Sequence, residues 1–343
     1  MYKHRRVYDQ SVHQPAFQPA NKVPDTTGTD RFPGFVVQKC RDIQYQRKLF
    51  WLFLQNRNQM GTMKYRLTCL CLLITLAILP ACEKFEFRGF ISSYETVNER
   101  FNQSMTWNRA HPVREVFLTE NNYLIYTMGD SHVGGTKNLN TFFQAARDDG
   151  AAATVMVGDL TTGHQADYET FASLLPDQET LLTFPLVGNH DLYFDGWKQY
   201  YSIFGFSTYA FVIHTPAGSD LFLCLDSGGG TLGTDQLAWL KNILETRREN
   251  YRFCMVFTHN NIFRLRPTTS TNPFVEEIRV LLDLFLRHRV EMVVTAHDHK
   301  RNTDNLGQTT HIIMDALSDD CPNAGYLKIY IQPGGVDFDF IDL

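Results

Sequence analysis

VVTAHDHKRN, residues 293–302, carries a hydrophobic strand directly into two histidines that are separated by one residue. Side chains alternate along an extended chain, so His297 and His299 share a face if extended geometry continues past Thr295. Neutral imidazole is the commonest nitrogen ligand of metal ions in proteins. The segment alone fits either two solvated loop histidines or two metal ligands, and the rest of the chain must decide between them.

The residues after position 120 show a regular order of strands and helices. Apolar runs of strand length lie at 123–128, 153–157, 183–187, 209–213, 221–225, 252–257 and 291–295. Helix-like stretches lie at 137–148, 165–175, 234–247 and 274–289. Three more strand-like runs lie at 309–314, 325–331 and 335–341. This alternation predicts an α/β domain whose sheets are covered by helices.

The composition is that of a globular protein, with 343 residues, 43% hydrophobic and 20% charged. No internal repeat or linker follows residue 120, which predicts a single domain over residues 121–343. A net charge of −5 gives no electrostatic footprint for nucleic-acid binding. Seven scattered cysteines are too few for a disulfide framework.

Residues 64–82, KYRLTCLCLLITLAILPAC, have the layout of an export signal. Two basic residues precede an apolar run from Leu67 to Leu79, which is shorter than the roughly 20 residues of a membrane-spanning helix. Ala81 and Cys82 resemble the lipobox of bacterial lipoproteins, in which the cysteine becomes the lipidated first residue. The alternative is a signal-anchor helix that is retained.

We therefore expect a signal peptide at 63–81, lipidation of Cys82 and an N-terminal extension at 82–120. The lipoprotein resemblance implies a location in the bacterial cell envelope, anchored to a membrane and facing the periplasm or the cell exterior. Residues 1–62 are polar and have no sustained period. Because Met60 or Met63 would serve as the start of an export signal, we interpret 1–62 as a non-native upstream extension or a disordered tail. A short cytoplasmic tail is the alternative.

Polar side chains follow five of the predicted strands. Ligands in open α/β sheets gather at the carboxyl ends of the strands. The five segments are Gly129–His132 (GDSH), Gly158–Asp159 (GD), Gly188–Asp191 (GNHD), Thr258–His259 (TH) and Ala296–His299 (AHDH). Any one of them fits a turn, but five in order indicate a shared site.

This ordered set resembles the calcineurin-like metallophosphoesterases, whose pattern runs DxH, GDxx, GNH[DE], a lone H and GHxH. The resemblance covers residues 121–331 and implies two packed mixed β-sheets flanked by helices, a four-layer αββα fold. It also implies a phosphate-ester substrate and a two-metal centre, at which a metal-bridging hydroxide attacks phosphorus. We expect a monomer.

By this resemblance, one metal is held by Asp130, His132 and His299, and the second by Asn189, His259 and His297, with Asp159 bridging both. Mixed nitrogen and oxygen ligands suit manganese, zinc or iron, divalent or trivalent, and disfavour calcium. The shared carboxylate would hold the ions roughly 3.5–4 Å apart.

The resemblance makes His190 a general acid that protonates the leaving oxygen. Asp191 is then the acid expected to orient the His190 imidazole. A cap or turn role is the alternative for Asp191.

Two residues depart from the family pattern. Ala296 stands where the family usually has glycine, and it would be strained if that position needs a positive φ. Thr162 replaces the tyrosine that ligates ferric iron in the purple acid phosphatase branch, so we set that subclass aside.

Substrate contacts are only weakly indicated. His164, Arg264 and Arg266 lie in loops near the motifs and could approach the substrate, although each also fits a solvated loop. The rival function is a catalytically inactive surface lipoprotein of the same fold that binds metal or phosphate. A structural lipoprotein with incidental histidines would not explain the order of the five motifs.

Overall fold

The computed structural model describes residues 94–111, 115–133, 136–262 and 275–343. The expected signal peptide, the predicted lipidation site Cys82 and the segment 1–62 lie outside these residues. Arg264 and Arg266 also lie outside them.

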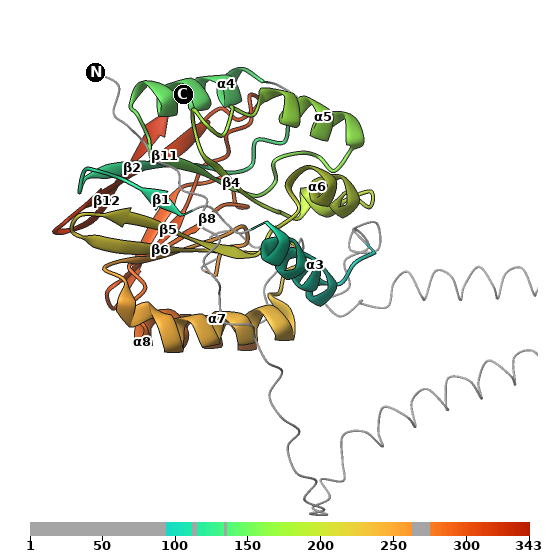
Figure 1. Cartoon of the computed structure of the whole chain (residues 1–343). Helices are drawn as coiled ribbons and strands as arrows, with labels where there is room; N and C mark the ends of the chain where they lie inside the picture. Colours follow the sequence, from blue (N-terminus) through green and yellow to red (C-terminus); the bar gives the residue numbers. More distant parts are fainter. Residues whose placement is uncertain (1–93, 112–114, 134–135, 263–274) are drawn as a thin grey trace, which may run out of the picture. The chain divides into compact units, whose positions relative to one another are not determined.

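Two mixed β-sheets form the centre of the domain (Figure 1). The strand order of the seven-stranded sheet is β1 (Val116–Phe117), β5 (Tyr209–Thr215), β6 (Gly218–Leu225), β7 (Cys254–Thr258), β8 (Met292–Thr295), β10 (Thr309–Ile313) and β9 (Asn302–Leu306). The order of the five-stranded sheet is β12 (Gly335–Asp342), β11 (Gly325–Gln332), β2 (Tyr123–Met128), β3 (Ala153–Val157) and β4 (Thr183–Leu186).

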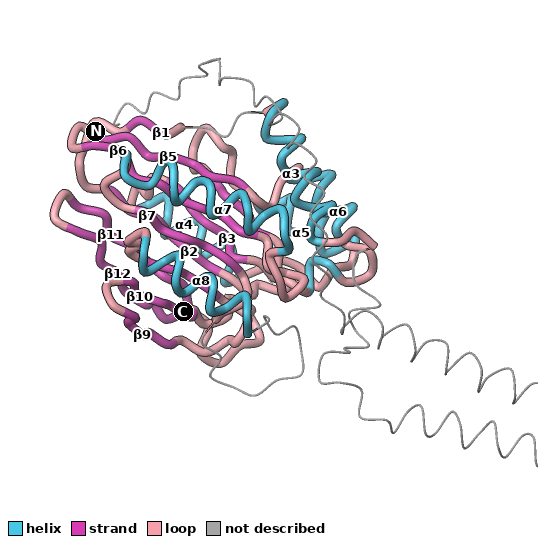
Figure 2. The backbone as a smooth tube through the Cα atoms, turned by 90° about the horizontal axis from the view of Figure 1, so that it is seen from below, coloured by secondary structure: helices cyan, strands magenta, loops and turns pink. Residues whose placement is uncertain are grey.

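Helices cover the outer face of each sheet. The five-stranded sheet packs against α4 (Lys137–Asp148), α5 (Gln165–Leu174) and α6 (Trp197–Phe204). The seven-stranded sheet packs against α7 (Gly233–Arg247) and α8 (Val275–Arg287), which lie across its strands in Figure 2. The described residues also form two 3₁₀ turns, η3 (His190–Leu192) and η4 (Arg248–Asn250). The predicted four-layer αββα architecture is confirmed.

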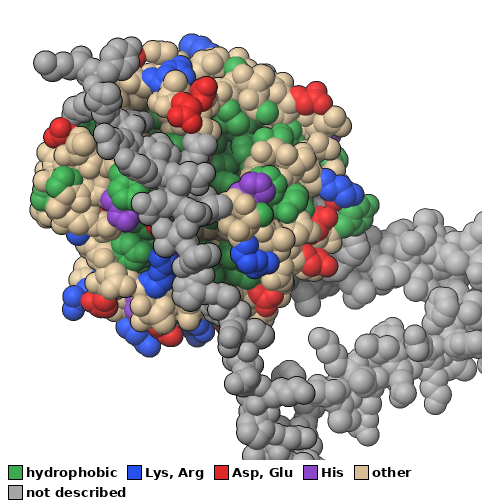
Figure 3. Space-filling view, in the orientation of Figure 1, with side chains coloured by type: hydrophobic (Ala, Val, Ile, Leu, Met, Phe, Trp, Pro, Cys, Tyr) green, Lys and Arg blue, Asp and Glu red, His purple; other side chains and the backbone are tan. Residues whose placement is uncertain are grey.

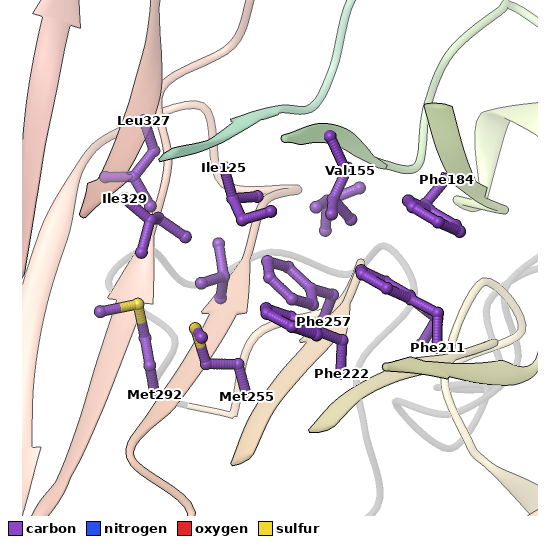
Figure 4. Packing of buried hydrophobic residues seen from close by; sticks show 14 of the residues in the cluster. Ile125, Val155, Phe184, Phe211, Phe222, Met255, Phe257, Met292, Leu327 and Ile329 are labelled. Atoms are coloured by element: carbon purple, nitrogen blue, oxygen red, sulfur yellow. The ribbon is translucent and has the colours of Figure 1, made fainter. Parts of the chain in front are cut away.

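The inner faces of the two sheets enclose an apolar core that includes a column of stacked rings. Figure 4 shows Phe184 of one sheet facing Phe211 of the other. Their ring centroids lie 3.8 Å apart with an interplanar angle of 2°, and Phe222 continues the column 4.6 Å beyond Phe211. Burial of each such side chain contributes roughly 1.5–3 kcal/mol relative to exposure.

Parallel pairing brings the motif-bearing strand ends together. β2, β3 and β4 run parallel in one sheet, and β7 and β8 run parallel in the other. The two sheets meet where His259, after β7, contacts the carbonyl of Val157 at the end of β3. The five motifs therefore share one end of the sandwich.

Helix α3 (Val97–Ala110) precedes the regular α/β order, in the segment that was expected only as an N-terminal extension. Thr96 and Glu99 form a capping box at its start. Its buried residues are Arg100, Phe101 and Ser104, so no apolar period marks the helix in the sequence. Three further elements, α6, β1 and β9, are also absent from the sequence prediction.

Among the described residues, no helix combines the length and the apolar character needed to cross a membrane. Acidic and basic side chains are interspersed on the face drawn in Figure 3.

Candidate metal centre

Seven predicted ligands come from the loops that follow β2, β3, β4, β7 and β8. All seven converge at one end of the sandwich, in two groups, and Asp159 also forms a possible group with His132 and His190.

The first group contains Asp130, His132 and His299. Nε2 of His299 lies 3.2 Å from Oδ1 of Asp130, and Nε2 of His132 lies 3.9 Å from the same oxygen. The two imidazole nitrogens are 3.2 Å apart. Three donor atoms therefore face one point between them.

The second group is built around His259. Its Nε2 atom lies 3.2 Å from Nδ1 of His297 and 3.1 Å from Oδ1 of Asn189. The same nitrogen lies 3.3 Å from Oδ2 of Asp159. The ring of His259 is fully buried, so this cluster lies deeper than His299, whose side chain is 35% exposed.

Asp159 stands between the two groups. Its Oδ2 atom is 3.3 Å from His259 and 3.9 Å from His132. Its other oxygen accepts a hydrogen bond of 2.7 Å from the backbone N–H of His190. One carboxylate oxygen is thereby left facing both groups, which is the arrangement that a bridging ligand needs.

The donor set fits two metal cations. The buried Oδ1 of Asp130 faces the Nε2 atoms of His299 and His132. Each of the two imidazole pairs, His132–His299 and His259–His297, places ring nitrogens 3.2 Å apart, where at most one proton fits. Cations would satisfy all of these acceptors, and the nitrogen–oxygen mixture suits manganese, zinc or iron.

Neighbouring groups orient the ligands. Nδ1–H of His259 donates to the carbonyl of Val157, 2.9 Å away, which leaves Nε2 available as a ligand. Nδ2 of Asn189 donates to the hydroxyl of Tyr193 at 3.2 Å, so the amide oxygen faces His259. Sequence reasoning missed Tyr193. Its position four residues after Asn189 carries no recognisable signal without the fold.

Opposite charges set the ionisation of the metal-free site. Burial opposes ionisation of Asp159, but the positive charges of His259, His190 and His132 outweigh it and lower the pKa of the carboxyl group. Burial likewise disfavours charge on His259, yet Asp159 and Asp130 raise the pKa of that imidazole to about 9. Metal binding must displace this proton, because only the neutral imidazole is a ligand.

Backbone strain concentrates at the ligands. Positive φ angles occur at Asp130 (53°), His132 (39°), Asp159 (50°), His297 (72°) and His299 (56°). Each such conformation costs of order 1–3 kcal/mol and persists where surrounding packing enforces it.

Ala296 is not among the residues with positive φ, so the strain considered for this departure from the family pattern is absent. The left-handed positions fall instead on His297 and His299. Ala296 is buried, and a Cβ placed on Gly129 would lie 2.6 Å from the Ala296 Cβ. The alanine therefore fits because its neighbour across the site is a glycine.

The structure corrects the expected pairing of Asp191 with the His190 imidazole. The buried Asp191 carboxylate accepts hydrogen bonds from the backbone N–H groups of Gly188 (2.9 Å), Leu160 (3.2 Å) and Thr161 (2.8 Å). The Thr161 hydroxyl also donates to it. Burial and the nearby Asp159 raise the pKa of Asp191 to about 7. Asp191 therefore links the loop after β3 to the loop after β4 through hydrogen bonds. This agrees with the cap or turn role that was the alternative for this residue.

His190 lies at the outer side of the centre. Its ring is 4.5 Å from the His132 ring, and its side chain is 35% exposed. Burial lowers the pKa of this imidazole despite the opposing effect of Asp159. Nε2 lies 4.0 Å from Oδ2 of Asp159, so His190 is near enough to reach an ion or a substrate.

His164, the weakly predicted substrate residue, is exposed at the start of α5. Its ring stacks on Phe194, with centroids 4.1 Å apart and an interplanar angle of 18°. Phe194 lies between η3 and α6 and was not singled out from the sequence.

A profile for the family described as "Calcineurin-like phosphoesterase" matches residues 123–301. No curated protein sequence gives a significant match. A dimetal phosphatase from Danio rerio has the same fold, with a TM-score of 0.52 and 13% identity over 64% of this chain and 98% of that chain. For the purple acid phosphatase PPD1 of yellow lupin the TM-score is 0.52, with 12% identity over 66% and 54%. GAP50, described as the anchor in the inner membrane complex of Plasmodium, gives 0.50, with 11% identity over 65% and 85%.

Proposed function

The chain belongs to the calcineurin-like phosphoesterase family, and from this we propose that it hydrolyses phosphate mono- or diesters with two bound metal ions. It is a metal-dependent hydrolase of phosphoester bonds. The observation that carries the proposal is Oδ2 of Asp159, which faces both ligand groups from a single buried carboxylate. GAP50, which is described as an anchor, shares this fold. The proposal that this chain is catalytically active therefore rests on its ligand residues and not on the fold alone.

Asp130, His132 and His299 would hold one cation, and Asn189, His259 and His297 the other, with Asp159 shared. When bound, the two ions supply a nucleophile from water near neutral pH and neutralise negative charge on the phosphoryl group. The Val157 carbonyl orients the His259 ring, and the Tyr193 hydroxyl orients the Asn189 amide.

His190 would serve the leaving group. The attacking water gives one proton to solvent and its oxygen becomes bonded to phosphorus as the ester P–O bond breaks. The protonated His190 imidazolium passes its proton to the departing alkoxide oxygen and is left as neutral imidazole. A general acid of this kind contributes typically 10²–10⁴-fold to the rate. The partial exposure of the His190 side chain supports this role, because an incoming ester can reach it.

The test is an activity screen of metal-reconstituted protein against phosphate mono- and diesters, with metal content measured on the same samples. We expect hydrolysis of at least one ester class by the wild type and its loss in Asp159→Asn. Asp148→Asn, an exposed position on α4, is the matched control and should retain full activity. A metal-loaded wild type that hydrolyses no ester would instead support an inactive metal- or phosphate-binding protein.

We also propose that the enzyme is a monomeric, lipid-anchored protein of the bacterial cell envelope. The support is the signal-like segment 63–81 followed by Cys82. In this proposal the mature chain begins at Cys82, and 82–120 is an N-terminal extension whose helix α3 packs onto the domain over 121–343. Residues 1–62 are a non-native upstream extension or a disordered tail.

A further inference from the structure

A continuous series of rings leads from the metal centre to the protein surface. The rings of His132 and His190 lie 4.5 Å apart, and those of His190 and Tyr193 lie 4.8 Å apart. Phe194 follows at 6.5 Å from Tyr193 and stacks on His164. Successive ring contacts therefore connect the first ligand group to the exposed Phe194–His164 pair.

Phe194 is unusually placed for an apolar side chain. It is 54% exposed although one face of its ring already stacks on His164, so the ring's remaining surface is open to solvent. Its backbone is left-handed, with φ of 56°, and Asp195 follows with φ of 60°. A bulky aromatic residue in this conformation is costly, and such strain clusters at ligand-binding positions.

The surrounding loops hold this conformation. A Cβ on Gly163 would lie 2.6 Å from the carbonyl oxygens of both His190 and Tyr193, so the loop before α5 packs backbone to backbone against this turn. The Tyr168 hydroxyl of α5 donates to the Asp191 carbonyl at 2.6 Å. The start of α5 and the loop before α6 lie close together in Figure 1 and Figure 2. These contacts hold the turn that carries Phe194 in one conformation.

We propose that Phe194 and His164 form a subsite that stacks a planar aromatic ring carried by the leaving group of the phosphate ester. This inference rests on the proposed function of the metal centre. Tyr193 separates Phe194 from His190, so the ring fits a leaving group in which a spacer such as a pentose joins the ring to the ester oxygen. The substrate class is therefore a nucleoside phosphate or an ester of the same plan.

The kinetic test compares adenosine 5′-phosphate with ribose 5-phosphate, which share the scissile bond and differ in the ring. The wild type should have the lower KM for adenosine 5′-phosphate. Phe194→Ala should raise that KM about tenfold, the loss that corresponds to roughly 1.4 kcal/mol of base stacking. Values for ribose 5-phosphate and for 4-nitrophenyl phosphate, whose ring is bonded directly to the ester oxygen, should stay within about twofold.

The chain offers a matched control in Phe117, whose ring stacks on His214 with centroids 4.4 Å apart. His214 pairs with Ser219 at the start of β6, the opposite end of the sheet from the metal centre. Phe117→Ala should leave all three substrates unchanged. Phe194→Tyr should restore the preference for adenosine 5′-phosphate, because the ring is retained.

A binding measurement separates this inference from the proposed function. Saturation-transfer NMR on metal-free protein should detect adenosine and not ribose, and Phe194→Ala should lose the adenosine signal. Adenosine binding through Phe194 in a protein that hydrolyses no ester would retain the subsite and overturn the proposed function. Ester hydrolysis with equal KM values for the two sugar phosphates, unchanged in Phe194→Ala, would overturn the subsite alone.

Discussion

Arg100 and Asp226 form a buried, two-pronged ion pair that fastens helix α3 to the phosphoesterase domain. Nε of Arg100 lies 2.8 Å from Oδ2 of Asp226, and Nη2 lies 3.0 Å from Oδ1. The two side chains are only 3% and 1% exposed. Because α3 precedes the family match at 123–301, this pair makes the helix an integral part of the folded domain.

Breaking the pair should be strongly destabilising. Arg100→Met leaves the Asp226 carboxylate buried without its partner, which costs about 3–5 kcal/mol of unfolding free energy. Arg287→Met, in the exposed Arg287–Asp283 pair of α8, should cost under about 1 kcal/mol. Urea unfolding of both variants measures the contrast, and equal losses would contradict the buried-pair account.

The metal centre should bind close to two ions per chain, because Asp159 faces two separate ligand groups. Asp159→Asn should lower occupancy of both sites, whereas His299→Ala should chiefly empty one. His214→Ala, a histidine at the far end of the sheet, is the control and should keep both ions. Elemental analysis after metal reconstitution measures the number of ions bound per chain. One ion or none in the wild type would rule out a dinuclear centre.

His190→Ala should keep its metals and lose most activity on alkyl or sugar phosphates. The activity of this variant on nitrophenyl esters should fall clearly less, because a nitrophenolate leaves without needing a proton. Steady-state kinetics on both substrate types, with metal content measured alongside, provide the test. Equal losses at full occupancy would indicate substrate positioning, and a missing ion would make His190 a ligand.

Acid should destabilise the fold through His311, which is buried in β10. Burial lowers the pKa of His311 to about 4, with Asp304 opposing the shift. Between about pH 6.5 and 4 the unfolded chain takes up a proton that the folded chain does not, so stability falls as pH falls. The loss should approach about 3 kcal/mol. Unfolding measured at pH 7 and pH 4 should show a smaller drop in His311→Phe, and identical drops would exclude this group as the cause.

Lipidation can be tested in a bacterial host with protein expressed from Met63. The protein should incorporate labelled fatty acid and fractionate with membranes, and Cys82→Ser should lose the label. A soluble, unlabelled wild type would contradict the proposed anchor.

Much of the fold was predictable because the strands carry their own signal. The run 123–128 matches β2 and 153–157 matches β3, since each is a continuous apolar segment bounded by turn residues. Helix α3 could not be delimited, because its buried face includes Arg100 and Ser104, which pair with residues far along the chain. The metal ligands could be predicted from the sequence because five strand ends carry polar motifs in order.

Contacts between loops could not be predicted from the sequence in the same way. The sequence places Asp191 next to His190 and suggests that the two side chains interact, whereas the 3₁₀ turn η3 directs the carboxylate toward the backbone of Leu160 and Thr161. Tyr193 and Phe194 gain their roles only from the turn that presents them beside His190 and His164. Such roles depend on loop geometry that no local period encodes.

The close approach of Gly129 and Ala296 has an evolutionary consequence. The two positions share room for a single methyl group, since a Cβ at Gly129 would lie 2.6 Å from the one that Ala296 already has. Mutation should therefore move that methyl group from one loop to the other only through a state in which both residues are glycine. Among relatives we expect the small residues to covary as Gly–Ala, Gly–Gly or Ala–Gly, with the Ala–Ala combination selected against.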